Sequence, residues 1–500
     1  MATNKVTLLL YCLLIGICPL AGQGYDRTWI TGMHEYPDTP GYNNVTLKFS
    51  PGSIDIQEVD LRMNFESTVG AISDSSGNLL FYTNGCHIAN ASGDTMPGSD
   101  GLNPGEMHDW TCGKTGYVCP RGVLILPLPD NPNVYYLFHM GARYDAIRKL
   151  TYGPLYYTVV DMQLDGGRGA VVTKNNLVTD GDLEPFTAVR HGNGRDWWIV
   201  TPEYATNIYR LFLLGPGGLQ GPYTQSIGSV MPCRRIGSST FSLRGDKFAR
   251  AQNCQAIVFD FDRCAGTFYN PLLLDLPDNS VGGGGVAFSP NSERLLVATQ
   301  LQIYQADLTL AAPKLDSAFE WNYYQWGVRL QYMQYTPDGQ ILLNHMHRTN
   351  YFSVLENPEA SGEGLHFVPK GLPLPVYSAR TLPNYPNYRL YDLPGSACDT
   401  LGIDGPTATS EPQHIRNQTW VQLSPNPASD HVEIASGQAP IPPVRIRCYT
   451  TAGHLVLDQS HPAHLRLYRL DVSALTSGCY LMEIILGDQS RIWKKCSVMH

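Results

Sequence analysis

The chain has 500 residues, of which 43% are hydrophobic, and this length exceeds what one compact core usually holds. Only 16% are charged, and this low content together with the apolar fraction excludes a coiled coil or a disordered chain. The 48 glycines, 36 prolines and 29 tyrosines are typical of many short strands joined by tight turns. The net charge of −9 argues against a nucleic-acid partner, which would normally need a basic face.

The first segment, residues 1–24, has the pattern of a secretory signal peptide. Lys5 supplies the positive start, residues 6–17 are apolar, and small residues follow at 19–22. A membrane anchor is the alternative, but the apolar run is shorter than the ~20 residues that a bilayer span needs. We therefore predict an exported protein without a transmembrane segment, either secreted or held at the outer cell surface.

The cysteines are expected to form disulfides, because the predicted compartment is oxidising. No Cys-x-x-Cys pair occurs, so we predict no zinc site and no cofactor. Cys254 and Cys264 flank a strand-like stretch, and Cys112 and Cys119 bracket a short loop. Both pairs are candidate local bridges, but spacing does not fix the connectivity.

A strand–turn–strand pattern recurs seven times, with Pro, Asn, Asp or Gly in each turn. The turns centre on Gly77, Asn131, Asn193, Gly245, Asn291, Asp338 and Tyr385, about 50 residues apart. A third strand often follows the pair. Repeats of three or four antiparallel strands at this WD-repeat-like spacing describe the blades of a propeller.

The side chains in the first strand of each repeat suit a ring. Small residues stand at Ala71, Ala188, Thr240 and Ala287, where strands would crowd toward an axis, and large apolar residues follow each of them. We predict an all-β chain with a seven-bladed β-propeller over residues 25–402. Two tandem β-sandwiches are the alternative, but ring closure would remove their exposed edges.

The final repeat shows two clear strands around Tyr385. We expect the N-terminal strands, residues 27–32 and 45–50, to complete that blade and close the ring.

Three groups of residues are candidates for ligand binding. Arg190 and His191, near Asp196, have the composition of an acid–base cluster, although the same residues make an ordinary hairpin turn. Four aromatic residues between two repeats could stack on sugars or on a protein, or could pack inside a blade; they are Trp321, Tyr323, Tyr324 and Trp326. Arg380 is a large, charged occupant of an otherwise small first-strand position.

His345 and His347 alternate along a strand and could share a face, but no third metal ligand is evident, so we predict no metal site. We name no catalytic residue.

Residues 403–418 form a Pro/Thr/Ser-containing linker without an apolar period, and residues 419–500 alternate like the short strands of a small Ig-like β-sandwich. This tail resembles the type A C-terminal sorting domain of type IX secretion in Bacteroidota. The matching positions are Pro425, Asn426, Pro427, Gly453, Leu470, Gly478, Tyr480, Lys494 and Lys495. The resemblance implies the type IX secretion machinery as a partner, followed by removal of the tail and often attachment to surface lipopolysaccharide.

The propeller region is similar to a group of secreted Bacteroidota proteins with the same tail, and this similarity implies no particular chemistry. We favour a surface or secreted binding and adhesion module for glycans or proteins over an enzyme. A secreted hydrolase or lyase acting on polysaccharide is the alternative, and it would need charged residues converging on the ring axis. The sequence leaves open the ligand, the disulfide pairing, the oligomeric state, and whether the mature protein is released or attached.

Overall fold

The computed structural model divides the chain into two compact units, Met1–Gly405 and Pro406–His500, which are described separately. The structure describes residues 24–34, 39–50, 53–145, 149–231, 237–252, 254–277, 283–321, 327–403, 422–435, 443–450, 454–460, 467–486 and 491–499. The predicted signal peptide and linker lie almost wholly outside these residues.

The described part of the first unit contains seven antiparallel sheets, which we number as blades 1–7 in chain order. Blade 1 holds β1 (Thr28–Gly32), β2 (Asn44–Ser50) and β3 (Ser53–Val59). Blade 2 holds β4 (Gly70–Ser73), β5 (Leu79–Thr83) and β6 (Ile88–Asn90). Blade 3 holds β7 (Val123–Leu128), β8 (Asn131–Asp145), β9 (Lys149–Asp161) and β10 (Ala170–Thr179). Blade 4 holds β11 (Thr187–Arg190), β12 (Trp197–Pro202), β13 (Ile208–Gly215) and β14 (Gly218–Ser226). Blade 5 holds β15 (Ser238–Phe241), β16 (Lys247–Ala251), β17 (Gln255–Asp262) and β18 (Thr267–Asp275). Blade 6 holds β19 (Gly283–Phe288), β20 (Arg294–Thr299), β21 (Gln302–Asp307) and β22 (Asp316–Glu320). Blade 7 holds β23 (Leu330–Tyr335), β24 (Ile341–His345), β25 (Tyr351–Leu355) and β26 (Phe367–Pro373).

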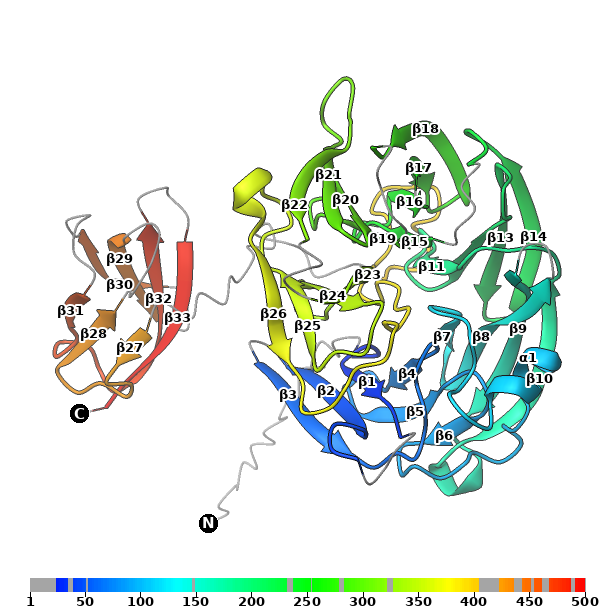
Figure 1. The fold of residues 1–500 in the computed structure, drawn as a ribbon. Coiled ribbons are helices and arrows are strands. Elements are labelled where there is room, and N and C mark those ends of the chain that lie inside the picture. Colours follow the sequence, from blue (N-terminus) through cyan, green and yellow to red (C-terminus); the bar gives the residue numbers. More distant parts are fainter. Residues whose placement is uncertain are drawn as a thin grey trace, which may run out of the picture. The chain divides into compact units, whose positions relative to one another are not determined.

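The blades stand around an axis, with the first strands of blades 2–7 toward the centre and the last strand of each blade at the rim (Figure 1). First strands of successive blades are neighbours, as β11, β15, β19 and β23 show. A blade of four antiparallel strands returns the chain to the face on which it began. We call that face, where β7, β11 and the following first strands begin, the inlet face, and the opposite one the outlet face. The fold is a seven-bladed β-propeller, as predicted.

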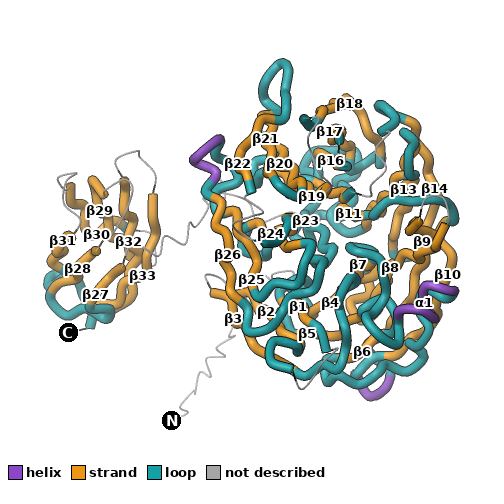
Figure 2. The backbone as a smooth tube through the Cα atoms, viewed as in Figure 1, coloured by secondary structure: helices purple, strands orange, loops and turns teal. Residues whose placement is uncertain are grey.

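Helical residues are few and peripheral (Figure 2). They form α1 (Glu106–Thr111), η1 (Asp165–Gly167) and η2 (Gly362–Leu365). α1 belongs to the long connection between β6 and β7, where blade 2 has no fourth strand among its described residues.

The packing follows the predicted alternation of small and large residues. Ala188, Thr240 and Ala287 line a cavity at the ring centre. The next residue along the strand is apolar and lies between blades: Val189 of blade 4, for example, shares a buried cluster with Phe248 of blade 5. Small side chains therefore let the first strands approach the axis, and large ones fill the space between sheets.

The structure corrects the prediction that the seventh repeat, around Tyr385, forms two strands. Residues 377–403 are all described, and they form no strand, only an isolated bridge between Asp392 and Asn193. Because Pro383 and Pro386 lack the N–H that a ladder requires, this stretch cannot pair continuously. It runs instead through the middle of the ring as an irregular segment (Figures 1 and 2). We call residues 377–398 the central segment.

The central segment nevertheless occupies the innermost position of blade 1, as the closure prediction required. The Ala379 amide donates to Thr31 Oγ1 at 2.8 Å, and the Tyr385 hydroxyl donates to the Thr28 carbonyl at 3.3 Å, so the segment runs antiparallel to β1. Near the outlet face, Arg389 pairs with both oxygens of Asp26. The first and last parts of the propeller are thus joined by side-chain contacts rather than by a ladder.

Other blades also hold the central segment. Arg121, fully buried before β7, donates to the carbonyl of Pro383 and to Asn384 Oδ1. The hydroxyl of Tyr388 donates to the Ile125 carbonyl at 2.6 Å. At the outlet face a disulfide joins Cys398 to Cys264, which lies in the turn between β17 and β18.

Both predicted local disulfides are wrong. Cys112 pairs with Cys86, while Cys119 is a buried free thiol whose pKa burial raises. Cys264 pairs with Cys398, so Cys254, which is itself disulfide-bonded, has another partner. The physical reason is plain for the second pair: Cys254 and Cys264 stand at opposite ends of an eight-residue strand, β17. At about 3.3 Å per residue such ends lie far beyond the ~6 Å Cα separation of a disulfide.

The C-terminal unit is a sandwich of two antiparallel sheets. One sheet holds β27 (Gln422–Ser424), β28 (His431–Ala435) and β31 (Leu467–Asp471), and the other holds β30 (Leu455–Ser460), β29 (Pro443–Thr450), β32 (Gly478–Leu486) and β33 (Arg491–Val498). Their inner faces enclose one core, in which Val432 and Leu470 of the first sheet pack with Ile446 and Met482 of the second. This agrees with the predicted small β-sandwich.

Candidate binding surface

The ring axis offers little room for chemistry. The central cavity has a volume of about 50 Å³, only enough for a few water molecules. Its walls carry mainly alanine, threonine and other uncharged side chains, including Gln334. Among its lining residues the charged ones are Asp26 and Arg389, which pair with each other. The charged residues of this cavity therefore form one ion pair rather than a converging cluster.

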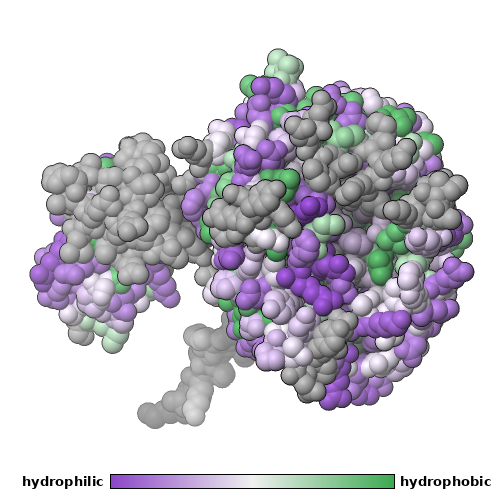
Figure 3. All heavy atoms as spheres, viewed as in Figure 1, coloured by the Kyte–Doolittle hydropathy of each residue, from purple (hydrophilic) through white to green (hydrophobic). Residues whose placement is uncertain are grey.

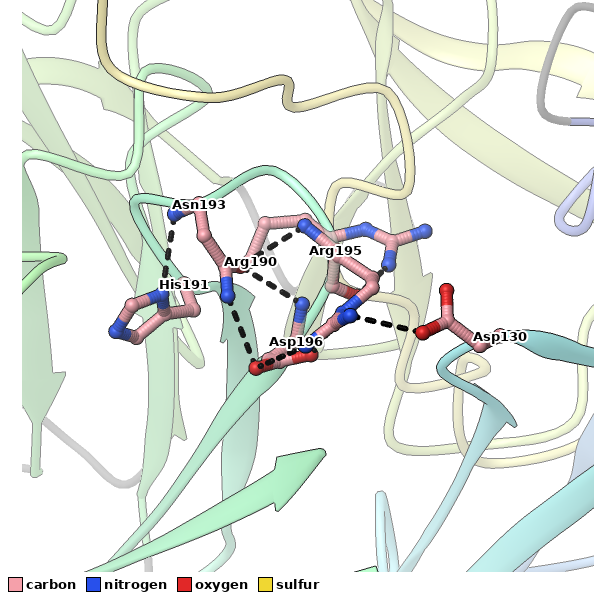
Figure 4. A network of polar contacts seen from close by, with 6 residues as sticks. All are labelled: Asp130, Arg190, His191, Asn193, Arg195 and Asp196. Atoms are coloured by element: carbon pink, nitrogen blue, oxygen red, sulfur yellow. Dashed lines mark hydrogen bonds and ion pairs between the residues drawn. The ribbon is translucent and has the colours of Figure 1, made fainter. Parts of the chain in front are cut away.

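The cluster predicted around Arg190 and His191 forms at the outlet face, in the turn between β11 and β12 (Figure 4). Both ring nitrogens of His191 are engaged: Nδ1 accepts the Asn193 amide at 3.0 Å, and Nε2 donates to the Cys264 carbonyl at 3.0 Å. With both nitrogens engaged, neither is available to transfer a proton to a ligand.

The charged members of the cluster are equally occupied. Asp196 accepts from Arg195 Nε at 2.8 Å and from Asn193 Nδ2 at 2.9 Å, and Arg195 also pairs with Asp130 of the β7–β8 turn (Figure 4). Arg190 is 7% exposed and lies 3.8 Å over the Trp197 ring. Burial lowers the pKa of Arg190 to about 10. The cluster therefore ties blade 3, blade 4 and the Cys264 turn together, and it presents no open site.

The aromatic candidate between blades 6 and 7 is partly inside the protein. Trp321 is 2% exposed, donates through Nε1 to the Val328 carbonyl at 2.7 Å, and packs its ring 5.5 Å from that of His345. The alternative of a side chain packed inside the blade thus holds for Trp321. Tyr323, Tyr324 and Trp326 lie outside the described residues, so their binding role stays a prediction.

The other two candidates also meet protein partners. Arg380 forms an ion pair with the buried Glu66 at the inlet face, and Arg348 reaches the same carboxylate at 3.2 Å. His345 is buried with contacts from both nitrogens to Thr349 and Ser353, and burial lowers its pKa to about 3. His347, by contrast, is exposed, so the two histidines do not face a common site.

The structure exposes a different aromatic residue, Trp110 on α1. Its side chain is 61% exposed, whereas the tryptophans at positions 29, 197, 198 and 321 are at most 5% exposed. A large ring left in water is characteristic of a contact site, because tryptophan contributes more binding energy on burial than almost any other side chain. α1 packs against β8, whose Tyr144 is also 61% exposed.

Trp110 is held firmly although its ring is exposed. Two residues later, Cys112 is bonded to Cys86, which leads into β6. In the same turn of α1, Met107 is buried in the propeller core, and Thr111 donates to the Met107 carbonyl at 2.7 Å. We call the exposed surface of α1 around Trp110 the Trp110 rim. Most of the visible described surface is hydrophilic, with hydrophobic residues scattered over it (Figure 3).

Sequence reasoning missed Trp110 because a single tryptophan in a non-repeating loop has no periodicity. One signal was available: Trp110 follows Glu106, His108 and Asp109 and stands two residues before a cysteine, and polar neighbours of this kind disfavour burial.

In the C-terminal unit, the residues of the predicted sorting motif have structural roles. Asn426 donates from Nδ2 to the Lys495 carbonyl and accepts the Ser497 amide at 2.8 Å, which fastens the segment after β27 to β33. Leu470 is buried, and the Tyr480 hydroxyl donates to the Thr476 carbonyl. Pro425 and Pro427 flank Asn426, Gly478 begins β32, and Lys494 lies on β33; Gly453 is outside the described residues.

Comparison with known families agrees with this geometry. Residues 422–499 match the family described as the secretion system C-terminal sorting domain. The chain therefore carries a type IX sorting domain, and the protein is secreted or displayed on the cell surface. The match covers only the C-terminal unit and assigns no family to the propeller. In the described part of the chain, no helix has the length and apolar character needed to cross a membrane.

A search of the curated proteins found no significant match. Among solved structures, the chain is similar to a protein from Bacteroides uniformis provisionally described as a 6-phosphogluconolactonase (15% identity, TM-score 0.41, 70% of this chain and 97% of that one). It is also similar to a functionally unknown protein from Desulfotomaculum acetoxidans (11%, 0.41, 72% and 99%) and to Kluyveromyces lactis Hsv2 (10%, 0.34, 66% and 91%). At these identities and scores the similarities say nothing about activity.

Proposed function

We propose that the protein is an exported binding and adhesion module that contacts a glycan or a protein through the Trp110 rim. The observation that carries this proposal is the exposure of Trp110, 61%, on a helix fixed by the Cys86–Cys112 disulfide. A rigid aromatic side chain loses little conformational entropy on binding, which favours a contact role.

The small volume of the central cavity favours ligand binding at the outer surface of the propeller over chemistry at the ring axis. The central segment takes up the space along blade 1, and the remaining cavity of about 50 Å³ is too small for a sugar ring. A ligand of any size would therefore meet the outside of the propeller, where the connections between blades lie.

The test is a glycan and protein array probed with the secreted protein and two variants. Trp110→Ala removes the proposed contact, and Tyr269→Ala removes an aromatic residue of comparable exposure, 47%, on β18 of blade 5. We expect Trp110→Ala to lose the array signal and Tyr269→Ala to keep it. Equal signals from the two variants would refute the proposal.

We also propose that the mature protein consists of the propeller alone, after loss of residues 1 to about 24 and of everything beyond about residue 417. The sorting domain at 422–499 supports this, as does the Cys264–Cys398 bond, because both of its cysteines lie before the linker and would stay in the mature chain. Intact mass and terminal sequencing of protein from the cell surface and the medium test it; a mature chain that keeps residues 425–500 would contradict it.

A further inference from the structure

The charges around Trp110 limit what the rim can bind. The connection between β6 and β7, residues 91–122, contains the acidic residues Asp94, Asp100, Glu106 and Asp109. Its basic residues are Lys114 and Arg121, and Arg121 is buried at the ring centre, where its guanidinium donates to Gln334 and Asn384. Basic side chains from outside the connection meet two of these residues: Arg168 lies 3.7 Å from Asp94, and Lys174 donates to the Asp100 carbonyl. The part of the connection that forms α1, with Glu106 and Asp109, is predominantly negative.

Two of these carboxylates belong to the same short helix as Trp110. Glu106 precedes Trp110 by four residues, so the two side chains share one face of α1, and Asp109 is the adjacent residue. The Asp109 side chain is 84% exposed even though it contacts the His108 ring at 3.3 Å. An indole with carboxylates beside it attracts cations, since the ring face is itself a negative pole.

We propose that the Trp110 rim binds a basic polypeptide surface, with a lysine or arginine side chain stacked on Trp110 and with Glu106 and Asp109 as its counter-charges. This inference rests on the proposed function and names the partner class for the same surface. Charge complementarity favours this partner: an acidic glycan would be repelled, whereas a cationic side chain is attracted both by the ring face and by the two carboxylates. The propeller as a whole has more acidic than basic residues, which would steer a basic partner toward it.

The probe is a fluorescent decapeptide of alternating lysine and serine, compared with a glutamate–serine peptide and with neutral oligosaccharides. Binding to the purified full-length chain is measured by anisotropy at low and at physiological ionic strength. We expect the lysine peptide to bind, Trp110→Ala to weaken it by about tenfold, and the double variant E106Q/D109N to weaken it and flatten its salt dependence. Tyr269→Ala is the matched aromatic control and should bind as the unchanged chain does.

Two results would overturn the inference. If Trp110→Ala binds the lysine peptide as well as the unchanged chain, the attraction comes from net charge rather than from this rim. If neutral oligosaccharides bind in a Trp110-dependent way and the lysine peptide does not, the partner class is wrong while the proposed function stands. Loss of Trp110 dependence for every probe, including the arrays, would remove the proposed function as well. Asp109→Lys, at a side chain exposed to solvent, repeats the test without removing the indole.

Discussion

The Cys264–Cys398 disulfide should contribute more to the stability of the propeller than the Cys86–Cys112 disulfide. The first joins residues 134 positions apart and fixes the end of the central segment to blade 5, whereas the second closes a local connection of 26 positions. The perturbation is the double variant C264S/C398S, with C86S/C112S as the matched comparison.

The magnitude follows from the entropy that each cross-link removes from the unfolded chain. In the chain-entropy model, a loop of the longer separation contributes about 5 kcal/mol at 25 °C and one of the shorter separation about 3.6 kcal/mol. The longer bond also keeps the central segment in the ring, where Tyr388 and Asn384 make buried hydrogen bonds to β7 and its approach. Its removal should therefore loosen the closure between blade 1 and the rest of the ring.

The assay is urea unfolding of the purified chain without reductant, followed by tryptophan fluorescence, together with hydrogen exchange of residues 377–398. We expect the larger loss of unfolding free energy, and faster exchange of the central segment, for C264S/C398S. A loss equal to or smaller than that of C86S/C112S, with unchanged exchange, would refute the argument that the longer bond closes the ring.

Three further changes test the packing and the sorting domain. Glu184→Gln leaves Arg250 buried without its counter-charge, the pair being at most 1% exposed, and should cost about 3–5 kcal/mol in urea unfolding; a loss below about 1 kcal/mol would contradict it. Burial lowers the pKa of His139 and of His345 to about 3, so both stay neutral when folded but gain protons on unfolding below pH ~6.5. The free energy of unfolding should therefore fall from pH ~6.5 toward pH ~3, by up to about 1.4 kcal/mol per pH unit for each histidine. His345→Asn should reduce by about one the number of protons taken up on unfolding, which is read from the slope of unfolding free energy against pH. An unchanged slope would be contrary to this. Asn426→Ala removes both bonds to β33 and should reduce the protein recovered from the medium; undiminished export would disprove that role.

The repeats were legible in the sequence because blade strands are short, local and alternate in burial. Turn residues and first-strand side chains such as Ala188 and Val189 contact neighbours within the same or the next sheet. Because each blade repeats these contacts, the residue types recur with a period of about 50 residues. The sandwich of the sorting domain was legible for the same reason, and its family match confirms its position.

The candidate site was less accessible to sequence reasoning. Trp321 and Trp110 both lie in connections between blades, yet one is packed against His345 and the other faces water. Composition cannot distinguish them, because the difference depends on which element covers each connection. The Arg190–His191 turn likewise has catalytic composition, and only the contacts of His191 with Cys264 and Asn193 show that both of its ring nitrogens are occupied.

By itself, the sequence determined the all-β class, the number of blades and the C-terminal sorting domain, since each of these depends on local alternation and short motifs. Only the tertiary structure decided that the central segment forms no strand, that Cys398 reaches Cys264, and that Trp110 is exposed. These features depend on contacts between residues far apart in the chain, which ring closure brings together and which no local pattern records.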